Sequence, residues 1–477
     1  MRNKILSIIL SVLLLVPTVF VFSSSKDYNS KIKVKAYADL PVVRIFTENG
    51  KNPEDKENYV NCSFEISNCE NEEHNFKVTM KENYKFEEDG GGVGVRLRGN
   101  TTMRFKKKPY RIKFEKSKSL FGLKKAKSWV LLADYLDTSN IRNYTAMTLG
   151  NDVFTNLDFT AHPNHVVLEF NGEYKGVYLL CEQMDEKEGR ANVEVDEDEL
   201  YTNYTKTEFP FLIEMDEYAR ADNSIDDADR LLVDGYWPIE IKYPEAKDRG
   251  TYNQEDIFYD YITEYLQAVK TTLKTHEKVT VRFRDEPVGF EDLVDVQSLI
   301  DYNLLNEFMY NADSVWKSSY MHKSVNKVDE EGNIVEYSKL KFGPVWDFDW
   351  AICKEYSGKP ANKEHKEIAN KITVFDRSVI FTDFLKDADN FTLVANRWNE
   401  IKDRVKQVSD KLINYKSIIK NPSEFDAVKW YGFGGRKRFN SQYDFVQSFV
   451  LERMNYFNEL FNLEHSDFLE EADILLS

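Results

Sequence analysis

The chain has 477 residues, of which 42% are apolar and 14% aromatic, and this composition is typical of a globular protein with a large core. No Pro/Gly/Ser linker is long enough to separate independent modules. The net charge of −17 and the pI near 5.1 argue against non-specific binding to DNA or RNA, which requires a basic surface. A basic substrate would suit this surface better.

The first 38 residues have the pattern of an export signal. Arg2 and Lys4 precede an apolar run from Ile5 to Phe22, and serines follow it. A positive flank, an apolar stretch and then polar residues are typical of a secretory signal peptide, and Ala36-Tyr37-Ala38 offers a cleavage site. The run is almost long enough to span a bilayer, so a retained N-terminal anchor is the alternative. Either reading predicts that the body of the protein is exported.

The chain has four cysteines, Cys62, Cys69, Cys181 and Cys353, whose spacings match no zinc-binding pattern. Cys62 and Cys69 could close a short hairpin disulfide in an exported protein or remain thiols, and the sequence leaves both readings open. Cys181 lies in an apolar strand and Cys353 follows an aromatic segment, so we expect both to be core thiols.

The first part of the chain is predicted to be rich in β-strands. Short alternating segments and turns run from Leu40 to Phe114, and a helix from about 140 to 154 is capped by Thr138 or Ser139. Asn171-Gly172 is a strong hairpin signal. Further strands are predicted at Trp129–Ala133, His165–Phe170 and Gly176–Cys181.

After Glu182 the pattern changes to predominantly helical. Two strands, a hairpin of Ser319–Lys323 with Leu340–Val345, and an acidic turn at Asp329–Asn333 interrupt the helices. The strands are predicted at Phe211–Met215 and Ile239–Tyr243. The helices are predicted at about Gln254–Thr275, Glu291–Tyr310 and Asp383–Leu463. We therefore expect an α+β protein, with a β-rich N-lobe over residues 39–184 and a helix-rich C-lobe over residues 185–477.

A basic segment in the first part of the chain offers a phosphate site. The turn around Gly99-Asn100 joins two predicted strands, and Arg111 and Lys113 lie on one face of the second strand. Backbone amides of a Gly-Asn turn together with an inward lysine can cradle phosphate. A solvated basic hairpin is the structural alternative.

Two acidic motifs in the second part are candidates for chemistry. Asp313 ends a predicted buried helix, where a carboxylate can act as a base for an incoming hydroxyl, although such a residue is usually only a cap. Asp347 and Asp349 lie among the aromatic residues of Trp346–Trp350 at the end of an apolar strand. Burial of two unpaired acids would be costly, so a bound cation is the natural compensation.

Taken in order, these motifs resemble those of the CotH family over about Val42 to Leu463. The motifs that carry the resemblance are Arg98–Thr102, Lys107–Phe114, Asp137–Asn143, Gly172–Gln183, Asn306–Asp313 and Gly343–Asp349. The resemblance implies an atypical, two-lobed protein-kinase-like fold that binds ATP with Mg²⁺ or Mn²⁺. It also implies phosphorylation of Ser or Thr in coat or envelope proteins, and a location in the spore coat, the cell envelope or outside the cell.

The resemblance also implies roles for individual residues. Asp313 would be the catalytic aspartate, Asp347 a metal ligand, and Asp349 an additional ligand or a supporting acid. Lys113 would contact the α- and β-phosphates, with Arg98 or Arg111 neutralising further charge and Asn100 in the phosphate-binding turn. The segment Cys181–Asp185 would be the hinge that reads adenine through its backbone, which brings Glu182 to the nucleotide.

Two departures from the kinase pattern are visible. The position five residues after the catalytic aspartate, where kinases place a metal-binding Asn, is Ser318, whose hydroxyl is the predicted substitute ligand. No clear helix glutamate pairs with Lys113, and Asp152 and Glu182 are the candidates.

Two functions of other classes compete with the kinase hypothesis. One is a catalytically inactive kinase-like scaffold for coat or envelope assembly. The other is a hydrolase, for example a glycosidase, that uses Asp313 and Asp347 as its carboxylate pair. The cluster of Arg and Lys has no role in the cleavage of a sugar and argues against this alternative.

Overall fold

The computed structural model describes residues 40–80, 92–187, 189–193, 208–220, 225, 229–235, 237–245, 257–352 and 368–475. The described residues fall into two compact units. The first unit takes its residues from the chain up to Lys127, from His165–Tyr178 and from Tyr415–Asn440. The second unit takes its residues from Ser128–Asn164, Leu179–Asn414 and Ser441–Ser477. The lobe boundary predicted at residues 184–185 stays a prediction, as does the N-terminal export segment, which lies outside the described residues.

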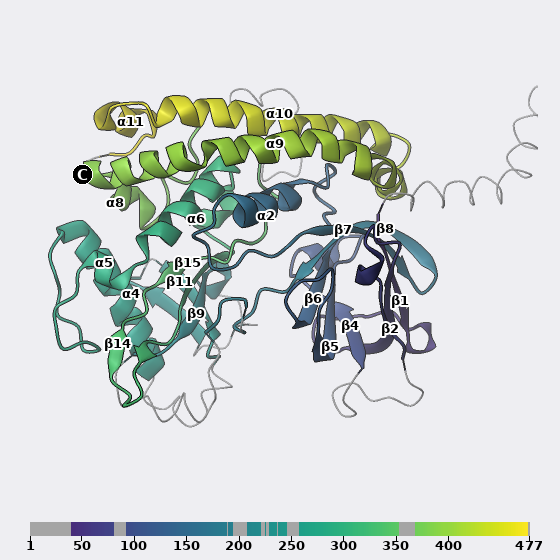
Figure 1. The fold of residues 1–477 in the computed structure, drawn as a ribbon, viewed down its shortest axis with the longest axis horizontal. Helices are drawn as coiled ribbons and strands as arrows, with labels where there is room; N and C mark the ends of the chain where they lie inside the picture. The colour runs from purple at the N-terminus through teal and green to yellow at the C-terminus, as the bar shows by residue number, and fades with distance from the viewer. Residues whose placement is uncertain are drawn as a thin grey trace, which may run out of the picture. The chain divides into compact units, whose positions relative to one another are not determined.

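The first unit is built mainly on β-strands (Figure 1). Strand β1 pairs in parallel with β7 and antiparallel with β2, which also pairs with β3 and β4, and β4 pairs with β5. The strands are β1 (Val42–Thr47), β2 (Val60–Ser67), β3 (Phe76–Val78), β4 (Val93–Leu97), β5 (Tyr110–Lys118) and β7 (Asn164–Phe170). Short 3₁₀ turns follow β1, β2 and β4 at Glu48–Gly50, Glu72–His74 and Thr102–Arg104.

Local sequence patterns of the first unit are confirmed. Along β5 the apolar positions are buried and the positions of Arg111 and Lys113 are half-buried, as the alternation predicts. Strand β8 (Glu173–Glu182) starts in the first unit, directly after Asn171-Gly172. Both residues of that turn have positive φ, 51° and 76°, which is the geometry of a two-residue hairpin turn.

Part of the C-terminal helical hairpin is fixed to the first unit by a buried cation. Lys107 is 1% exposed and its Nζ lies 2.9 Å from the Asp426 carboxylate and 2.5 Å from the Val177 carbonyl oxygen. Asp426 in turn accepts from the Val177 N–H. The helices of this hairpin are α9 (Ala388–Tyr431) and α10 (Gly435–Leu460), which run antiparallel (Figure 1).

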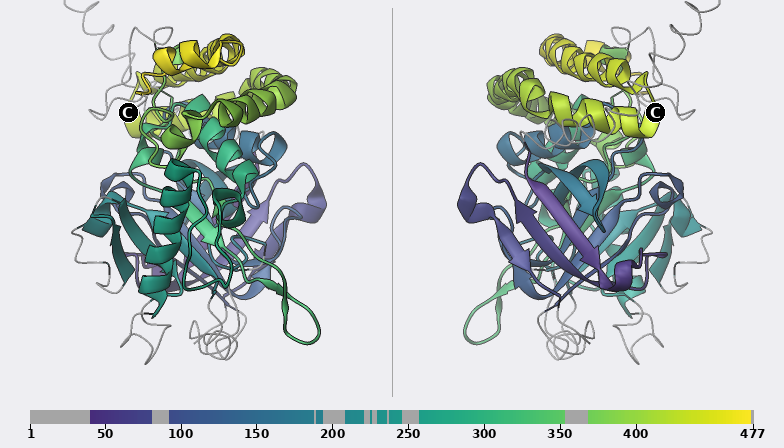
Figure 2. Two further views of the ribbon diagram at one scale, coloured as in Figure 1. Left: turned by 90° about the vertical axis from the view of Figure 1, so that its left-hand side faces the viewer. Right: turned by 90° about the vertical axis from the view of Figure 1, so that its right-hand side faces the viewer.

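The second unit contains most of the helices and a five-stranded sheet of order β10-β11-β9-β12-β15. Figure 2 gives two further views of these elements. The strands are β6 (Ala126–Leu132), β9 (Phe211–Met215), β10 (Arg230–Val233), β11 (Trp237–Tyr243), β12 (Ser319–Lys323), β13 (Lys327–Val328), β14 (Ile334–Glu336) and β15 (Lys341–Phe342). The helices are α2 (Arg142–Asp152), α4 (Ile257–Thr275), α5 (Phe290–Leu293), α6 (Val296–Phe308), α8 (Phe381–Leu385) and α11 (His465–Glu471), besides most of α9 and α10.

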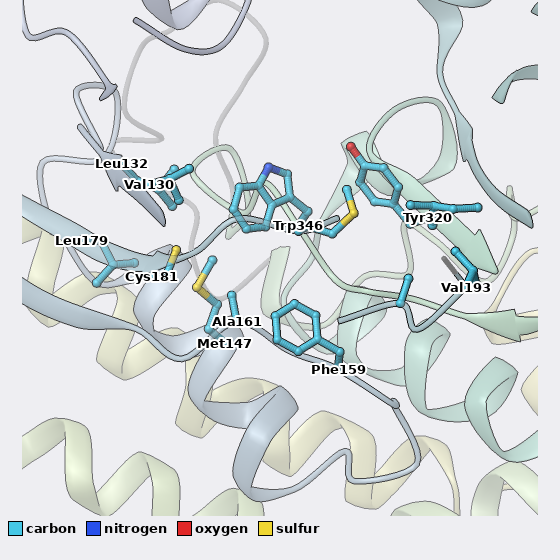
Figure 3. Packing of buried hydrophobic residues seen from close by; sticks show 13 residues of the cluster. Val130, Leu132, Met147, Phe159, Ala161, Leu179, Cys181, Val193, Tyr320 and Trp346 are labelled. Carbon is cyan, nitrogen blue, oxygen red and sulfur yellow. The ribbon is translucent and has the colours of Figure 1, made fainter. Parts of the chain in front are cut away.

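A cluster of buried apolar side chains lies in the second unit (Figure 3). Its members come from β6, the end of β8, α2, β9 and β12, and from the segments that follow α2, β8 and β15. Trp346, Tyr320 and Met147 are among them, and Cys181 is a fully buried thiol of the cluster, as predicted. This cluster therefore connects the strands of the unit to the segment that carries Asp347.

Two predicted elements differ from the structure. The helix predicted over Glu291–Tyr310 is divided into α5 and α6, because Asp295 has extended backbone and its carboxylate accepts from the Ser298 N–H at 2.9 Å. The pair formed by β12 and β15 is short, and a separate hairpin of β13 and β14 lies between them in the sequence. The acidic turn at Asp329–Asn333 is confirmed as the turn of that hairpin.

The structure has the mixed α+β composition expected, with a β-rich N-terminal region and a helical C-terminal region. Cys62 and Cys69 are free thiols, and Cys353 lies outside the described residues. In the part of the chain that the structure describes, no helix has the length and apolar character needed to cross a membrane.

Candidate active site

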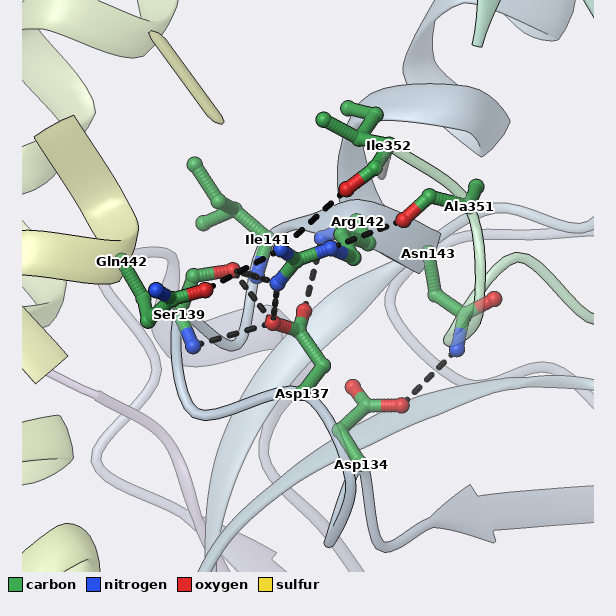
Figure 4. Close-up of polar contacts among 9 residues, drawn as sticks. All are labelled: Asp134, Asp137, Ser139, Ile141, Arg142, Asn143, Ala351, Ile352 and Gln442. Atoms are coloured by element: carbon green, nitrogen blue, oxygen red, sulfur yellow. Dashed lines mark hydrogen bonds and ion pairs between the residues drawn. The ribbon is translucent and has the colours of Figure 1, made fainter. Parts of the chain in front are cut away.

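The start of α2 is organised by Asp137 (Figure 4). This carboxylate is 1% exposed and accepts from the N–H groups of Ser139 and Arg142, each at 2.9 Å, and from the Arg142 guanidinium. Because α2 begins at Arg142 with Ile141 at the N-cap position, the prediction that Thr138 or Ser139 caps the helix is wrong, although the Ser139 hydroxyl accepts from the Ile141 N–H at 3.3 Å. Asp137 does this work because its negative charge suits the free N–H groups of a helix start and because its longer reach also holds Arg142.

Two residues of α2 hold the segment that follows β15 (Figure 4). The Asn143 side chain accepts from the Phe348 N–H at 2.8 Å and donates to Asp134 at 2.8 Å. Arg142 Nε donates to the Ala351 carbonyl at 2.9 Å. Backbone groups on both sides of Asp349 are thus fixed to one helix, which positions the acidic motif without using its carboxylates.

Asp347 and Asp349 differ in their exposure and in their partners. It is exposed between the buried Trp346 and Phe348, and its φ of 65° lies in the left-handed region. Among the described residues its carboxylate has no hydrogen bond or ion pair. Asp349 is 7% exposed and has partners of its own. The motif therefore presents one open carboxylate and one buried carboxylate.

Asp313 lies in a short 3₁₀ turn (Ala312–Val315) that follows α6. Its backbone carbonyl accepts from the Trp316 and Lys317 N–H groups at 2.9 and 2.8 Å, so its position is fixed by the backbone of the turn. The Ile352 N–H donates to the Met309 carbonyl at 2.9 Å, which joins the end of α6 to the segment carrying Asp347 and Asp349. The two predicted acidic motifs are therefore connected through the end of one helix.

Two further residues near this turn are relevant to metal binding. Asn311 is 2% exposed, and within the described residues its Oδ1 accepts no hydrogen bond. The predicted ligand Ser318 lies in the turn after Trp316 and has a positive φ of 53°. An amide oxygen and a hydroxyl are both acceptable ligands for a hard cation.

Glu182 lies at the end of β8, and its carboxylate is bound by His162. The carboxylate is 1% exposed, accepts from the His162 N–H at 2.7 Å, and lies 3.0 Å from His162 Nδ1. In the following segment the Met184 N–H donates to no acceptor among the described residues. Within the described residues, a backbone donor is therefore open where the hinge is predicted. Asp152, the other candidate partner of Lys113, pairs with Lys411 at 2.7 Å.

A cluster of acids on β11 and at the end of β9 was not predicted from the sequence. Carboxylate oxygens of Glu214, Asp216 and Glu240 all lie within 4.8 Å of one another. Burial and the neighbouring acids raise the pKa of Glu214 to about 7, and burial also raises the pKa of Asp216. Lys242 Nζ lies 2.8 Å from Glu240 and 3.4 Å from Glu214, so an ammonium group already compensates part of the charge.

This acidic cluster is close to the turn that carries Asp313. The Glu217 N–H donates to the Trp316 carbonyl at 2.8 Å, and Lys317 Nζ lies 4.9 Å from the centre of the Tyr218 ring. The signal in the sequence was the alternation of Glu214 and Asp216 at the end of β9, together with the single acid Glu240 in β11. The missing information was the register that sets Glu240 opposite Glu214.

In the first unit the predicted phosphate-binding residues lie on the hairpin of β4 and β5. Arg111 stands directly opposite Arg96, and both Arg96 and Lys113 lie over the Tyr59 ring, at 4.9 and 5.5 Å from its centre. Like charges in cross-strand positions are destabilising, so this face favours an anion. In the described part of the chain, Nε of Arg96 is buried and donates to no acceptor. Arg96 is thus a further candidate that the prediction did not include.

The turn of the same hairpin holds the other two predicted residues. Arg98 donates its N–H to the Pro109 carbonyl at 3.3 Å. The Asn100 side chain is exposed and accepts from Lys56 at 2.8 Å, and Gly99 has a positive φ of 82°. Arg98, Asn100, Arg111 and Lys113 belong to the first unit, whereas Glu182, Asp313, Ser318, Asp347 and Asp349 belong to the second. The joint action of the two groups stays a prediction.

The ordered motifs are matched by a family model. The model described as CotH kinase protein matches residues 95–457, which is most of the chain. The chain belongs to the CotH family. Membership of the CotH family suggests a kinase-like spore-coat protein. The match includes both acidic motifs, the β4–β5 hairpin and the start of α2, while no curated protein matches the chain.

Proposed function

We propose that this CotH-family protein is an exported, ATP-dependent protein kinase with a two-lobed kinase-like fold. It transfers the γ-phosphoryl group to Ser or Thr of spore-coat or envelope proteins. The observation that carries the proposal is the open carboxylate of Asp347, held in a family-matched motif by Asn143 and Arg142. An exposed carboxylate that accepts from no described residue, on a residue held at positive φ, has no evident role in the fold.

The residues present fit Mg²⁺ or Mn²⁺. Carboxylate, amide and hydroxyl oxygens are ligands of hard cations, and Asp347, Asp349 and Ser318 supply two of these types. The orphaned Oδ1 of Asn311 is a further oxygen available in the same unit. We propose that Asp347 is the principal ligand, with Asp349 as an additional ligand or supporting acid. A bound divalent ion would supply positive charge to the phosphates of ATP.

The roles of the other residues follow from their chemistry. Asp313 orients the acceptor hydroxyl and takes its proton as the new P–O bond forms, while ADP leaves. Arg111 and Lys113, with Arg98, bind the phosphates, and Asn100 belongs to the phosphate-binding turn.

Arg96 joins this set because its cross-strand neighbour is also a cation. The hinge around Glu182 would contact adenine through a backbone group, for which the open Met184 N–H is suited, while Glu182 itself stays with His162.

Metal-dependent nucleotide binding is the first test of the proposal. Thermal melting of the purified chain is measured with ATP alone, Mn²⁺ alone and both together. We expect a clear increase of the melting temperature only with both, since ligand binding stabilises the folded state by mass action. An unchanged melting temperature would exclude the active kinase. Binding without transfer of labelled phosphate to a Ser-containing basic peptide would favour the scaffold.

Two nearly isosteric variants separate the proposed roles. Asp347→Asn should weaken metal-dependent ATP binding, because an amide is a poor substitute for a carboxylate in the shell of a hard cation. Asp313→Asn should leave ATP affinity nearly intact and reduce single-turnover transfer by ~10²–10⁴-fold. Equal loss of ATP affinity in both variants would mean that the roles are assigned wrongly. Asp410→Asn, an exposed change on α9, is the control and should alter neither property.

A further inference from the structure

The turn between α9 and α10 combines an exposed aromatic ring with positive charge. Phe433 is 100% exposed, and in the described part of the chain no other large apolar side chain is as exposed. The ten residues from Lys429 to Arg438 contain four cations and no acid, in a chain of net charge −17. Isolated exposed apolar residues are common. Here the exposed ring coincides with a local excess of positive charge in a chain whose net charge is negative.

The geometry of the turn is fixed by its glycines. Gly432 has a φ of 75°, and a Cβ atom on Gly435 would lie 2.1 Å from the Ala427 carbonyl oxygen. The Gly432 N–H donates to Val428 and the Gly435 N–H donates to Gly432, both at 2.9 Å. The Phe433 ring is therefore presented outward by a defined turn, because the two glycines permit a closure that other residues would not.

The neighbouring aromatic rings and charges complete the tip. Trp430 Nε1 donates to the Lys175 carbonyl at 3.0 Å, and the Arg438 guanidinium lies 4.7 Å from the centre of the Tyr431 ring. Two of the cations are paired: Lys429 with Glu173 at 3.3 Å and Arg436 with Glu424 at 2.9 Å. Lys437 is exposed and forms no ion pair with any residue that the structure describes. With Lys175 included, five cations face two acids.

We propose that this tip binds the surface of a bilayer that contains anionic lipids. Aromatic rings and cations are side chains that favour the membrane interface, and a fully exposed ring can enter the acyl boundary. Cations near an anionic surface add attraction through the headgroups. A single-stranded nucleic acid would instead need a longer cationic track. The inference does not depend on kinase activity.

The predicted export segment would bring this surface close to a membrane. A signal or anchor at Ile5–Phe22 would bring the chain to a membrane, and the tip would then hold the folded part against it. At about 0.15 M salt the Debye length is about 8 Å, so the acids elsewhere on the chain are screened and the local charge of the tip decides the interaction. The bilayer is therefore a partner that the overall negative charge does not exclude.

Vesicle binding tests the proposal. The full chain and the chain starting at Asp39, which removes the apolar run, are sedimented with vesicles of phosphatidylcholine alone or with about 30% phosphatidylglycerol. We expect the shorter chain to bind only the anionic vesicles. Phe433→Ala should weaken binding about tenfold, because the buried ring is lost. Lys437→Gln should weaken it about fivefold. Phe433→Trp, unlike Phe433→Ala, keeps an aromatic ring and should bind about as well as the unchanged chain.

Similar changes on α9, the helix that precedes the turn, provide the control. Ile418 is 43% exposed on α9 in the first unit, and Lys420 is exposed nearby, so Ile418→Ala and Lys420→Gln remove the same chemistry elsewhere. Both should change vesicle binding less than twofold. The proposal is overturned if the chain from Asp39 does not prefer anionic vesicles, or if Phe433→Ala and Ile418→Ala behave alike. Binding to an oligonucleotide or to polyglutamate in place of vesicles would also overturn it.

Discussion

Two carboxylates of the second unit, those of Glu307 and Asp347, differ in how many hydrogen-bond donors the fold supplies to them. Glu307 is 0% exposed and is saturated: it pairs with Arg453 and accepts from the backbone N–H groups of Thr373, Val374 and Phe375. Asp347 is exposed, and no described residue donates to it. The fold supplies four donors for one carboxylate and only backbone support for the other.

This difference separates structural from functional acids. A buried charge without partners would cost several kcal/mol, so the donors around Glu307 are required by its burial. Asp347 needs no such compensation in water, yet the chain holds it at positive φ between two buried aromatic residues. The constraint acts on its position and leaves its oxygens available, which is the arrangement that a ligand requires.

The acidic cluster on β9 and β11 lies between these two cases. Glu214 is buried like Glu307, but its neighbours Asp216 and Glu240 are acids and only Lys242 compensates. The crowding raises the pKa of Glu214 to about 7. The cluster therefore destabilises the fold at neutral pH. It lies near the turn of Asp313, the residue that we propose orients the acceptor hydroxyl.

The largest expected effect comes from breaking the saturated pair. Arg453→Met should lower the free energy of unfolding by about 3–5 kcal/mol, since it leaves a buried carboxylate without its cation. The same guanidinium also donates to the carbonyls of Ala369 and Glu307, which would lose a donor. Denaturant unfolding measures the change. Lys406→Met, which breaks an exposed pair with Asp410, should alter stability by no more than about 0.5 kcal/mol.

Neutralising Glu214 should have the opposite sign. A carboxyl whose pKa is raised from 4.5 to about 7 in the folded state contributes stability that is fully present below pH 4.5 and is lost as the pH rises to 7. Glu214→Gln should therefore raise the free energy of unfolding by up to about 3 kcal/mol at pH 8, and by little at pH 4.5.

The control for this variant changes the other partner of Lys242. Glu240→Gln removes a 2.8 Å ion pair and should give no comparable gain at pH 8. Unfolding curves of both variants at pH 4.5 and pH 8 make the comparison. A gain of Glu214→Gln that is equal at both pH values would show that crowding of charge is not the cause.

A smaller effect is expected at the support of Asp347. Asn143→Ala removes the acceptor of the Phe348 N–H, whose hydrogen bond contributes about 1 kcal/mol, so exchange of this amide should accelerate about fivefold. Amide hydrogen exchange resolved at Phe348 measures it. Asn151→Ala, on the same helix, removes bonds to Met147 and Ala161 and should leave the Phe348 amide unaffected. Unchanged exchange in Asn143→Ala would remove this residue from the support.

Short-range features of the fold were predictable from the sequence. The Asn171-Gly172 hairpin, the alternation of Arg111 and Lys113 along β5, and strand β9 follow from neighbours in the chain, and the structure confirms them. Division of the helix at Asp295 was missed because the apolar pattern continues across it. Local patterns were therefore sufficient for single strands and turns, but not for the cap that Asp295 forms with Ser298 inside a continuous apolar pattern.

Features that depend on strand register were not predictable. Arg96 lies opposite Arg111, and Glu240 opposite Glu214, only because of the register in which their strands pair. Asp137 was part of a family-like motif, but its role at the start of α2 depends on the side chain of Arg142 folding back onto it. The predicted site residues are each placed by the structure, whereas their catalytic and binding roles stay predictions.

The smallest expected effect is the stability of variants at Asp347 itself. Asp and Asn adopt the left-handed conformation more readily than other residues with a Cβ atom, for which it costs about 1–2 kcal/mol. Asp347→Asn should therefore change the free energy of unfolding by less than about 0.5 kcal/mol, and Asp347→Ala should lower it by about 1 kcal/mol. Asp347→Gly keeps the positive φ without a Cβ atom and separates backbone strain from charge. If Asp347→Asn instead destabilised the protein as strongly as Arg453→Met, this carboxylate would be a structural acid like Glu307, and the metal-binding proposal would lose its support.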